Sequence, residues 1–101
     1  MIKVIKQWSM PNSKTFKISA IREIIAKYKK ILEDTYGDKK ILVVDPFANE
    51  ASIKVLFKDD RFKYISNDID EHFDTDYHMH AKEFLQKFPD SCVSLVLYDP
   101  P

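Results

Sequence analysis

The sequence predicts an α/β fold built on a parallel sheet, and two observations support this prediction. Short apolar runs rich in β-branched residues, which are typical of buried strands, alternate along the chain with segments whose apolar residues recur at helical spacing. Two of these runs end at Asp45 and Asp99, where proline follows at once and stops the strand. A chain of 101 residues, 45% of them hydrophobic, is long enough for one small domain.

The first half of the chain is expected to contain one long helix and one buried strand. Residues 2–6 alternate apolar and polar side chains, and residues 8–12 indicate irregular structure. We expect Ser19 to cap a helix whose apolar residues follow at helical spacing, and Gly37 to end it. The run Ile-Leu-Val-Val at residues 41–44 predicts a strand that is buried on both faces.

The second half is expected to alternate helices and strands. The expected elements are a short helix over residues 48–57, a strand over 62–66, a short strand around 77–79, a helix over 81–88 and a last strand over 93–98. The side chains expected to face inward from the first of these helices are Ile53, Leu56 and Phe57. Because strands and helices alternate, the strands should be parallel and their crossovers right-handed. The last strand would be an open edge of the sheet.

The composition excludes several classes of protein. Lys+Arg and Asp+Glu both number 16, so the net charge is zero and gives no global signature of nucleic-acid binding. The single cysteine excludes an intramolecular disulfide and fits a reducing cytoplasm, where we expect the protein to be located. No apolar run approaches the length of a membrane span, so no membrane partner is expected. The single glycine excludes a glycine-rich phosphate loop and a dinucleotide-binding fingerprint.

Three aspartates predict a ligand crevice at one edge of the sheet. Asp45, Asp68 and Asp99 each follow an apolar run, and ligands of α/β folds bind at the carboxyl ends of the strands. Asp68 lies 23 residues after Asp45, close to the spacing at which such folds hold ribose hydroxyls. A single aspartate at a strand end is often only a turn residue. Three of them, with two prolines after the last, favour a functional site.

These segments resemble motifs of amino-group methyltransferases that use S-adenosylmethionine. The segments that carry the resemblance occur in the order seen in that family, at residues 44–49, 67–70 and 97–101. The likeness is to DNA adenine methyltransferases of the type found in phages and bacteria, including restriction–modification systems. Trp-Ser-Met-Pro-Asn at residues 8–12 and Tyr-His-Met at residues 77–79 add to it. The resemblance covers nearly the whole chain but only the first half of such an enzyme.

The resemblance implies a catalytic motif and a cofactor site. Asp99, Pro100 and Pro101 match the start of the family's catalytic Asp-Pro-Pro-Tyr motif. Asp68 matches the acidic residue that binds the cofactor's ribose, and His80 falls where relatives carry an acidic residue near the cofactor's adenine. The other implied contacts, from the N-terminal motif and from the loop that holds the methionine part, are Phe16, Asp45, Phe47, Ala48 and Asn49. This loop has small or αL-tolerant residues instead of glycines, which lets a cofactor approach the backbone.

The fold that the resemblance implies is a partial Rossmann-like methyltransferase fold. Its strand order would be 3-2-1-4, with the strands counted from residue 41 onward. Residues 1–17 would form a segment that packs on the cofactor, and residues 18–101 a partial cofactor-binding and catalytic domain. The implied reaction transfers a methyl group from S-adenosylmethionine to the exocyclic amine of adenine in DNA. The chain ends before the aromatic residue of its catalytic motif, so we expect no methylation by these 101 residues alone.

Three other interpretations remain open. Asp-Pro-Pro motifs also occur in methyltransferases that act on guanine amines of ribosomal RNA, and the chain could be a non-catalytic fragment that at most binds the cofactor. The third is a metal site, because His78 and His80 would share one face of a strand near His72, Asp74 and Asp76. No nearby cysteine and no compact four-ligand spacing accompanies them, so we expect a solvated surface and no bound metal.

Overall fold

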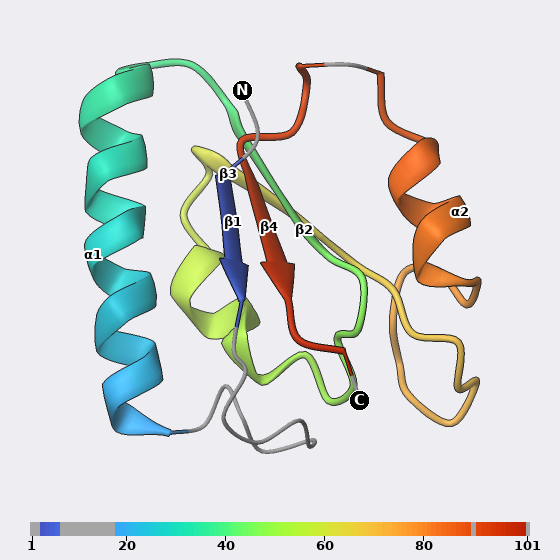
Figure 1. The fold of residues 1–101 in the computed structure, drawn as a ribbon. Coiled ribbons are helices and arrows are strands. Elements are labelled where there is room, and N and C mark those ends of the chain that lie inside the picture. The colour runs from blue at the N-terminus through green and yellow to red at the C-terminus, as the bar shows by residue number, and fades with distance from the viewer. Residues whose placement is uncertain (1–2, 7–17, 90, 101) are drawn as a thin grey trace.

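Within the described residues, four parallel strands form one sheet that has helices on both faces (Figure 1). The computed structural model describes residues 3–6, 18–89 and 91–100. The elements are β1 (Lys3–Lys6), α1 (Ser19–Tyr36), β2 (Ile41–Asp45), the 3-10 helix η2 (Ser52–Phe57), β3 (Phe62–Ser66), α2 (Ala81–Gln86) and β4 (Leu95–Tyr98). The α/β character and the parallel sheet predicted from the sequence are therefore confirmed.

The strands lie in the order β1-β4-β2-β3. β2 pairs with β3 along its full length, from Ile41 opposite Phe62 to Asp45 opposite Ser66, and it pairs with β4 on its other side. The three strands β3, β2 and β4 are thus neighbours in the relative order that the sequence predicted. Because all pairings are parallel, the carboxyl ends of these three strands meet at one edge of the sheet.

The predicted third strand at residues 77–79 is wrong. Tyr77 forms one isolated parallel bridge with Asn67, just beyond β3. The preceding residue, Asp76, turns its carboxylate back to accept hydrogen bonds from the backbone N–H and the hydroxyl of Ser66, at 2.8 and 3.1 Å. The backbone of Tyr77 makes the two hydrogen bonds of this bridge, and the side chains of Asp76 and Asn67 bind the neighbouring backbone groups of Ser66 and Met79. The pairing therefore stops after one bridge, and the predicted order 3-2-1-4 holds only for its members 2-1-4.

The other side of the sheet also differs from the prediction. β1 pairs in parallel with β4, from Lys3 opposite Leu95 to Lys6 opposite Tyr98. β4 therefore has a neighbour on each side, and the prediction that the last strand is an open edge is wrong. The alternation of apolar and polar residues at 2–6 is too short to predict this pairing.

Helix α1 begins at Ser19, the residue that was predicted to cap it. The N-cap is Ile18, whose carbonyl accepts the backbone N–H of Arg22 at 3.0 Å, and Ser19 is already helical with no side-chain cap at this end. The predicted role of Ser19 as the cap is therefore wrong. Gly37 ends the helix as predicted, because its φ of 57° favours glycine and its N–H donates to the carbonyl of Glu33 at 3.1 Å.

The loop after β2 delays the next helix. A helix was predicted over residues 48–57, but η2 begins only at Ser52. Asn49 and Ala51 have φ values of 53° and 54°, in the left-handed region, which a right-handed helix cannot accommodate. As predicted, the side chains that pack inward from η2 are Ile53, Leu56 and Phe57. Residues 46–51 therefore form a separate loop at the carboxyl end of β2.

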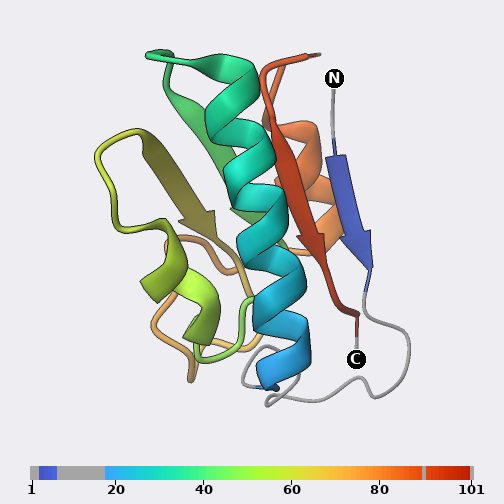
Figure 2. The ribbon, with the colours of Figure 1, turned by 90° about the vertical axis from the view of Figure 1, so that its left-hand side faces the viewer.

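Two apolar cores fill the two faces of the sheet. Figure 2 shows α1 and η2 on the viewer's side of the sheet and α2 behind it. The core under α1 and η2 consists of Ile25, Leu32, Ile41, Val43, Ile53, Phe57, Phe62, Leu95 and Leu97. The core under α2 is built by Phe84 with Val44, Val93 and Val96. β2 and β4 contribute to both cores, which explains their continuous apolar sequences. Across the described part of the chain, no helix has the length and apolar character needed to cross a membrane.

Candidate functional site

The three aspartates singled out in the sequence lie at the carboxyl ends of adjacent strands. Asp45 is the last residue of β2, Asp68 follows the end of β3, and Asp99 comes directly after β4. Asp45 has no exposed surface, Asp99 is 7% exposed, and Asp68 is partly exposed. The charges of Asp99 and Asp68 both act on Asp45, so the carboxylates form one electrostatic cluster.

Asp45 is the most strongly perturbed member of this cluster. The pKa of its carboxyl is raised from the ordinary value of 3.8 to about 7, mainly by burial. The charges of Asp99 and Asp68 contribute to this rise, and two hydrogen bonds oppose it. Tyr64 supplies one of them, with a hydroxyl that donates to Oδ2 of Asp45 at 2.6 Å, and the backbone of Phe47 supplies the other. The second oxygen, Oδ1, is buried and has no hydrogen-bond partner among the described residues.

Tyr64 reaches Asp45 from the neighbouring strand. Its ring stacks on Phe57 of η2, with 6.3 Å between the ring centroids and 8° between the planes. Burial raises the pKa of the Tyr64 hydroxyl, and the charge of Asp45 raises it further. The hydroxyl therefore stays protonated and remains a donor. The sequence analysis did not identify Tyr64, because nothing in a strand sequence indicates which carboxylate of the next strand a tyrosine will meet.

Asp68 holds the loop that follows β2. Its Oδ2 accepts the backbone N–H of Asn49 at 2.9 Å, and its Oδ1 accepts the backbone N–H of Asp70 at 3.0 Å. The left-handed conformations of Asn49 and Ala51 turn the backbone of this loop at the edge of the sheet. Asparagine tolerates this conformation, whereas alanine does so at a cost in energy. Each carboxylate oxygen has a second lone pair, so Asp68 can still accept hydrogen bonds from a ligand.

Asn67 connects three backbone segments beneath this loop. Its side chain is fully buried and donates to the carbonyl oxygens of Pro46 and Met79, at 3.1 and 2.9 Å. Its Oδ1 accepts the N–H of Met79 at 3.1 Å. Its own carbonyl accepts the N–H of Ala48 at 2.8 Å. Asn67 was noted in the sequence only as a neighbour of Asp68. A buried amide directly after an apolar strand is the signal that could have identified it.

Two aromatic rings join the loop to the strand that carries Asp99. The rings of Phe47 and Tyr98 meet edge to face, with centroids 5.3 Å apart and planes at 78°. Phe47 is one of the implied cofactor contacts in the loop, and Tyr98 is the residue before Asp99. Pro100 is partly buried, whereas Pro101 and Phe16 lie outside the described residues. The loop and the Asp99 segment are therefore in direct contact.

The histidine-rich segment borders this arrangement and meets it at the backbone of Asp68. His80 is exposed at the N-cap of α2, and the described hydrogen bonds of this residue involve its carbonyl oxygen, which accepts the N–H of Phe84 at 2.9 Å. His72 contacts Asp70 at 2.8 Å, and Nδ1 of His78 lies 3.1 Å from the carbonyl oxygen of Asp68. Over the part of the chain that the structure describes, no three His, Cys, Asp or Glu side chains come together as metal ligands.

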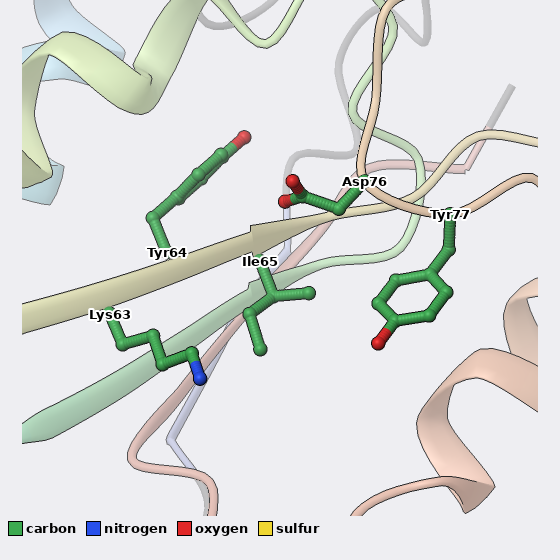
Figure 3. Close-up of a pocket in the computed structure, with 5 residues that line it drawn as sticks. All are labelled: Lys63, Tyr64, Ile65, Asp76 and Tyr77. Atoms are coloured by element: carbon green, nitrogen blue, oxygen red, sulfur yellow. The ribbon is translucent and has the colours of Figure 1, made fainter.

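A hollow of about 400 Å³ lies beside β3 rather than over the aspartates. Figure 3 shows that Tyr64 and Asp76 lie on one side of the strand and Lys63, Ile65 and Tyr77 on the other, so the hollow follows the outer edge of the sheet. We place the candidate site at the strand ends because the buried carboxylates lie there. Tyr64 belongs to both regions, since its side chain lines the hollow and its hydroxyl reaches Asp45.

The site combines carboxylates at three strand ends with the loop at residues 46–51, whose backbone N–H groups at residues 48–51 donate to acceptors within the protein. Such a set suits a ligand that carries positive charge and hydroxyl groups, because carboxylates attract the first and accept hydrogen bonds from the second. Comparison of the chain with family models, with curated proteins and with solved structures finds no match.

Proposed function

We propose that this chain forms the cofactor-binding part of an S-adenosylmethionine-dependent methyltransferase that acts on the exocyclic amine of adenine in DNA. The observation that carries the proposal is the placement of Asp45, Asp68 and Asp99 at the carboxyl ends of three adjacent parallel strands. The motif resemblance supplies the identity of the cofactor and of the substrate. The arrangement of the strand ends supports it as a site where such a ligand would bind.

The residues at this edge fit the cofactor's chemistry. S-adenosylmethionine carries a sulfonium and an ammonium group, and a cluster of carboxylates would favour these charges. The pKa of Asp45 is raised mainly by burial and also by the charges of Asp99 and Asp68, so a cation bound beside it would stabilise its ionised form. Asp68 would hold the ribose hydroxyls. The loop at Phe47, Ala48 and Asn49 would hold the methionine part. Because Asp45 is fully buried, we expect it to act through its charge at the base of this loop.

Asp99 and Pro100 would prepare the substrate amine. The lone pair of the exocyclic amine of adenine is delocalised into the ring, which makes this nitrogen a weak nucleophile. The Asp99 carboxylate and a backbone carbonyl fixed by proline can each accept one hydrogen of the amine. That arrangement holds the nitrogen toward a tetrahedral geometry and frees its lone pair. The bound cofactor supplies an activated methyl group. Positioning and preorganised charge would then account for most of the rate enhancement.

DNA is the proposed substrate, and the target base has to leave the helix to reach this site. The preference for adenine in DNA over guanine in ribosomal RNA rests on the resemblance at residues 8–12, which lie outside the described residues. The same edge of the sheet would bind the cofactor in either case. The cofactor is therefore the first part of the proposal to test.

Isothermal titration of the chain with S-adenosylmethionine tests this proposal, with ATP as the comparison ligand. We expect saturable binding of S-adenosylmethionine, weaker binding of ATP because its phosphates meet the carboxylates, and loss of binding in Asp68→Ala. The absence of binding to a folded chain would contradict the proposal. A parallel assay follows radioactive methyl transfer to adenine-containing DNA and to ribosomal RNA. Because we expect these 101 residues to bind the cofactor without turnover, transfer to either nucleic acid would contradict that expectation and would identify the substrate.

A further inference from the structure

We infer that Tyr64 is a positioning residue for the cofactor site, which acts by fixing the orientation of the Asp45 carboxylate through the hydrogen bond between Tyr64 Oη and Asp45 Oδ2. The inference rests on the proposed function, because it assigns a role in cofactor binding to a residue outside the recognised motifs. Tyr64 lies in the middle of β3, whereas the implied cofactor residues Asp45 and Asp68 lie at or just after the ends of their strands.

The Tyr64 hydroxyl is held in place by the packing of its ring. The ring stacks on Phe57 at 8°, and Phe57 in turn meets Phe62 edge to face, with centroids 5.4 Å apart. Phe57 and Phe62 belong to the core under α1 and η2, and Tyr64 packs against that core. The ring therefore has little freedom to turn. Its 2.6 Å hydrogen bond is made from a fixed position on β3 to the last residue of β2.

This hydrogen bond determines which oxygen of Asp45 remains available. Oδ2 is engaged by Tyr64, and Oδ1 is buried without a hydrogen-bond partner among the described residues. A buried oxygen without a hydrogen bond lowers the stability of the protein unless a ligand or a proton binds it. The carboxylates of Asp68 and Asp99 also act on Asp45, so the three together would favour a cation. A Tyr64 hydroxyl that holds Oδ2 thus keeps Oδ1 and its charge in one orientation.

The variant Tyr64→Phe removes the hydroxyl and keeps the ring on Phe57. Tyr77→Phe is the matched control, since Tyr77 also lines the hollow beside β3 but makes no described contact with Asp45. S-adenosylmethionine binding is measured by isothermal titration from pH 5.5 to 9 in the full chain and in both variants. The ¹³C signal of the Asp45 carboxyl is titrated in the same proteins without ligand. Urea unfolding verifies that each variant is folded.

We expect Tyr64→Phe to weaken binding about tenfold at pH 7, the effect of losing one hydrogen bond to a charged group. The hydrogen bond lowers the pKa of Asp45, so its loss should move the carboxyl titration to higher pH. A cation binds ionised Asp45 more tightly than protonated Asp45. The pH at which the affinity rises should therefore also move to a higher value in Tyr64→Phe. The groups that act on this titration are Tyr64, Asp68 and Asp99, while Asp76 acts on Tyr64. Tyr77→Phe should leave both curves unchanged.

The outcomes separate this inference from the proposed function. No binding of S-adenosylmethionine by the folded, unaltered chain would overturn the proposed function and, with it, the role of Tyr64. Normal binding together with equal affinities and equal Asp45 titrations in Tyr64→Phe would overturn only the inference. Equal losses of affinity in both variants would also overturn it, because they would indicate a general structural effect. Should Tyr64→Phe fail to fold, Asp45→Asn replaces it. That variant should bind with an affinity that no longer rises near pH 7, and an unchanged pH profile would overturn the inference.

Discussion

Oδ2 of Asp68 accepts the backbone N–H of Asn49 at 2.9 Å, so the segment that follows β3 fixes the loop that follows β2. Asn49 has a φ of 53°, a conformation that costs energy for a residue other than glycine. The carboxylate of Asp68 is therefore part of what keeps this loop in shape. Asp68, which the resemblance implies as a cofactor contact, therefore also has a structural role in the protein without ligand.

Asp68→Ala should both destabilise the protein and remove cofactor binding. The substitution leaves the N–H groups of Asn49 and Asp70 without their acceptor, which should lower the free energy of unfolding by about 1–3 kcal/mol. Urea unfolding measures this loss. Asp74→Ala is the control, because Asp74 is an exposed carboxylate of the same acidic segment, and it should change stability by less than about 0.5 kcal/mol. Equal stability of Asp68→Ala and the unaltered protein would contradict the structural role.

Replacement of Asn67 should be more damaging than replacement of any exposed amide. Asn67→Ala removes the side chain that joins Pro46 to Met79 and leaves buried backbone groups unpaired, so we expect a loss of about 3 kcal/mol or more in the free energy of unfolding. Asn67→Asp should also destabilise, because a carboxylate cannot donate to the two carbonyl oxygens. Thermal unfolding gives the comparison. Gln86→Ala, on the exposed side of α2, is the control, and a loss in it as large as in Asn67→Ala would contradict this account.

Arg61 stabilises the end of helix α1 from the turn before β3. Its guanidinium donates to the carbonyl oxygens of Glu33, at 2.9 Å, and of Gly37, and it lies 3.5 Å from the carboxylate of Glu33. Arg61→Ala should lower the free energy of unfolding by about 1–3 kcal/mol. In the guanidinium, Nη2 donates to both carbonyl oxygens while Nη1 faces the Glu33 carboxylate. Arg61→Lys should recover little of the stability, because the lysine side chain is one atom shorter and its ammonium lacks this planar fork.

Glu33→Gln separates the carbonyl contacts of Arg61 from its ion pair. The ion pair is partly exposed, so this variant should lose less than about 1 kcal/mol in urea unfolding. A loss as large as that of Arg61→Ala would assign the stabilisation to the ion pair and contradict the role of the carbonyl contacts.

The sequence predicts the framework of this site better than its interior. The apolar run at residues 41–44 and the prolines after Asp45 and Asp99 indicate where strands end, because burial and the missing N–H of proline act locally. The contact between Tyr64 and Asp45 depends instead on the register between two strands. The failed strand at residues 77–79 has a similar cause, since the side chains of Asp76 and Asn67 bind the backbone groups on either side of the single bridge at Tyr77. Such contacts follow from tertiary packing and leave no periodic trace in the sequence.

Asp45→Asn should make the stability of the protein less dependent on pH. The pKa of this carboxyl is about 7 in the folded chain, mainly because of burial, against an ordinary value of 3.8. The folded state thus holds the proton more tightly than the unfolded state, so stability falls as pH rises from 3.8 to about 7 and stays lower above that range. An asparagine side chain of the same shape removes this loss of stability, which is at most roughly 4 kcal/mol.

The Asp45→Asn variant should therefore be more stable than the unaltered protein at pH 8, and this difference in stability should be smaller at pH 5. Urea unfolding at both pH values measures the difference, with the exposed Asp38→Asn as control. The same difference at pH 5 and pH 8 would contradict the assignment of the buried proton to Asp45.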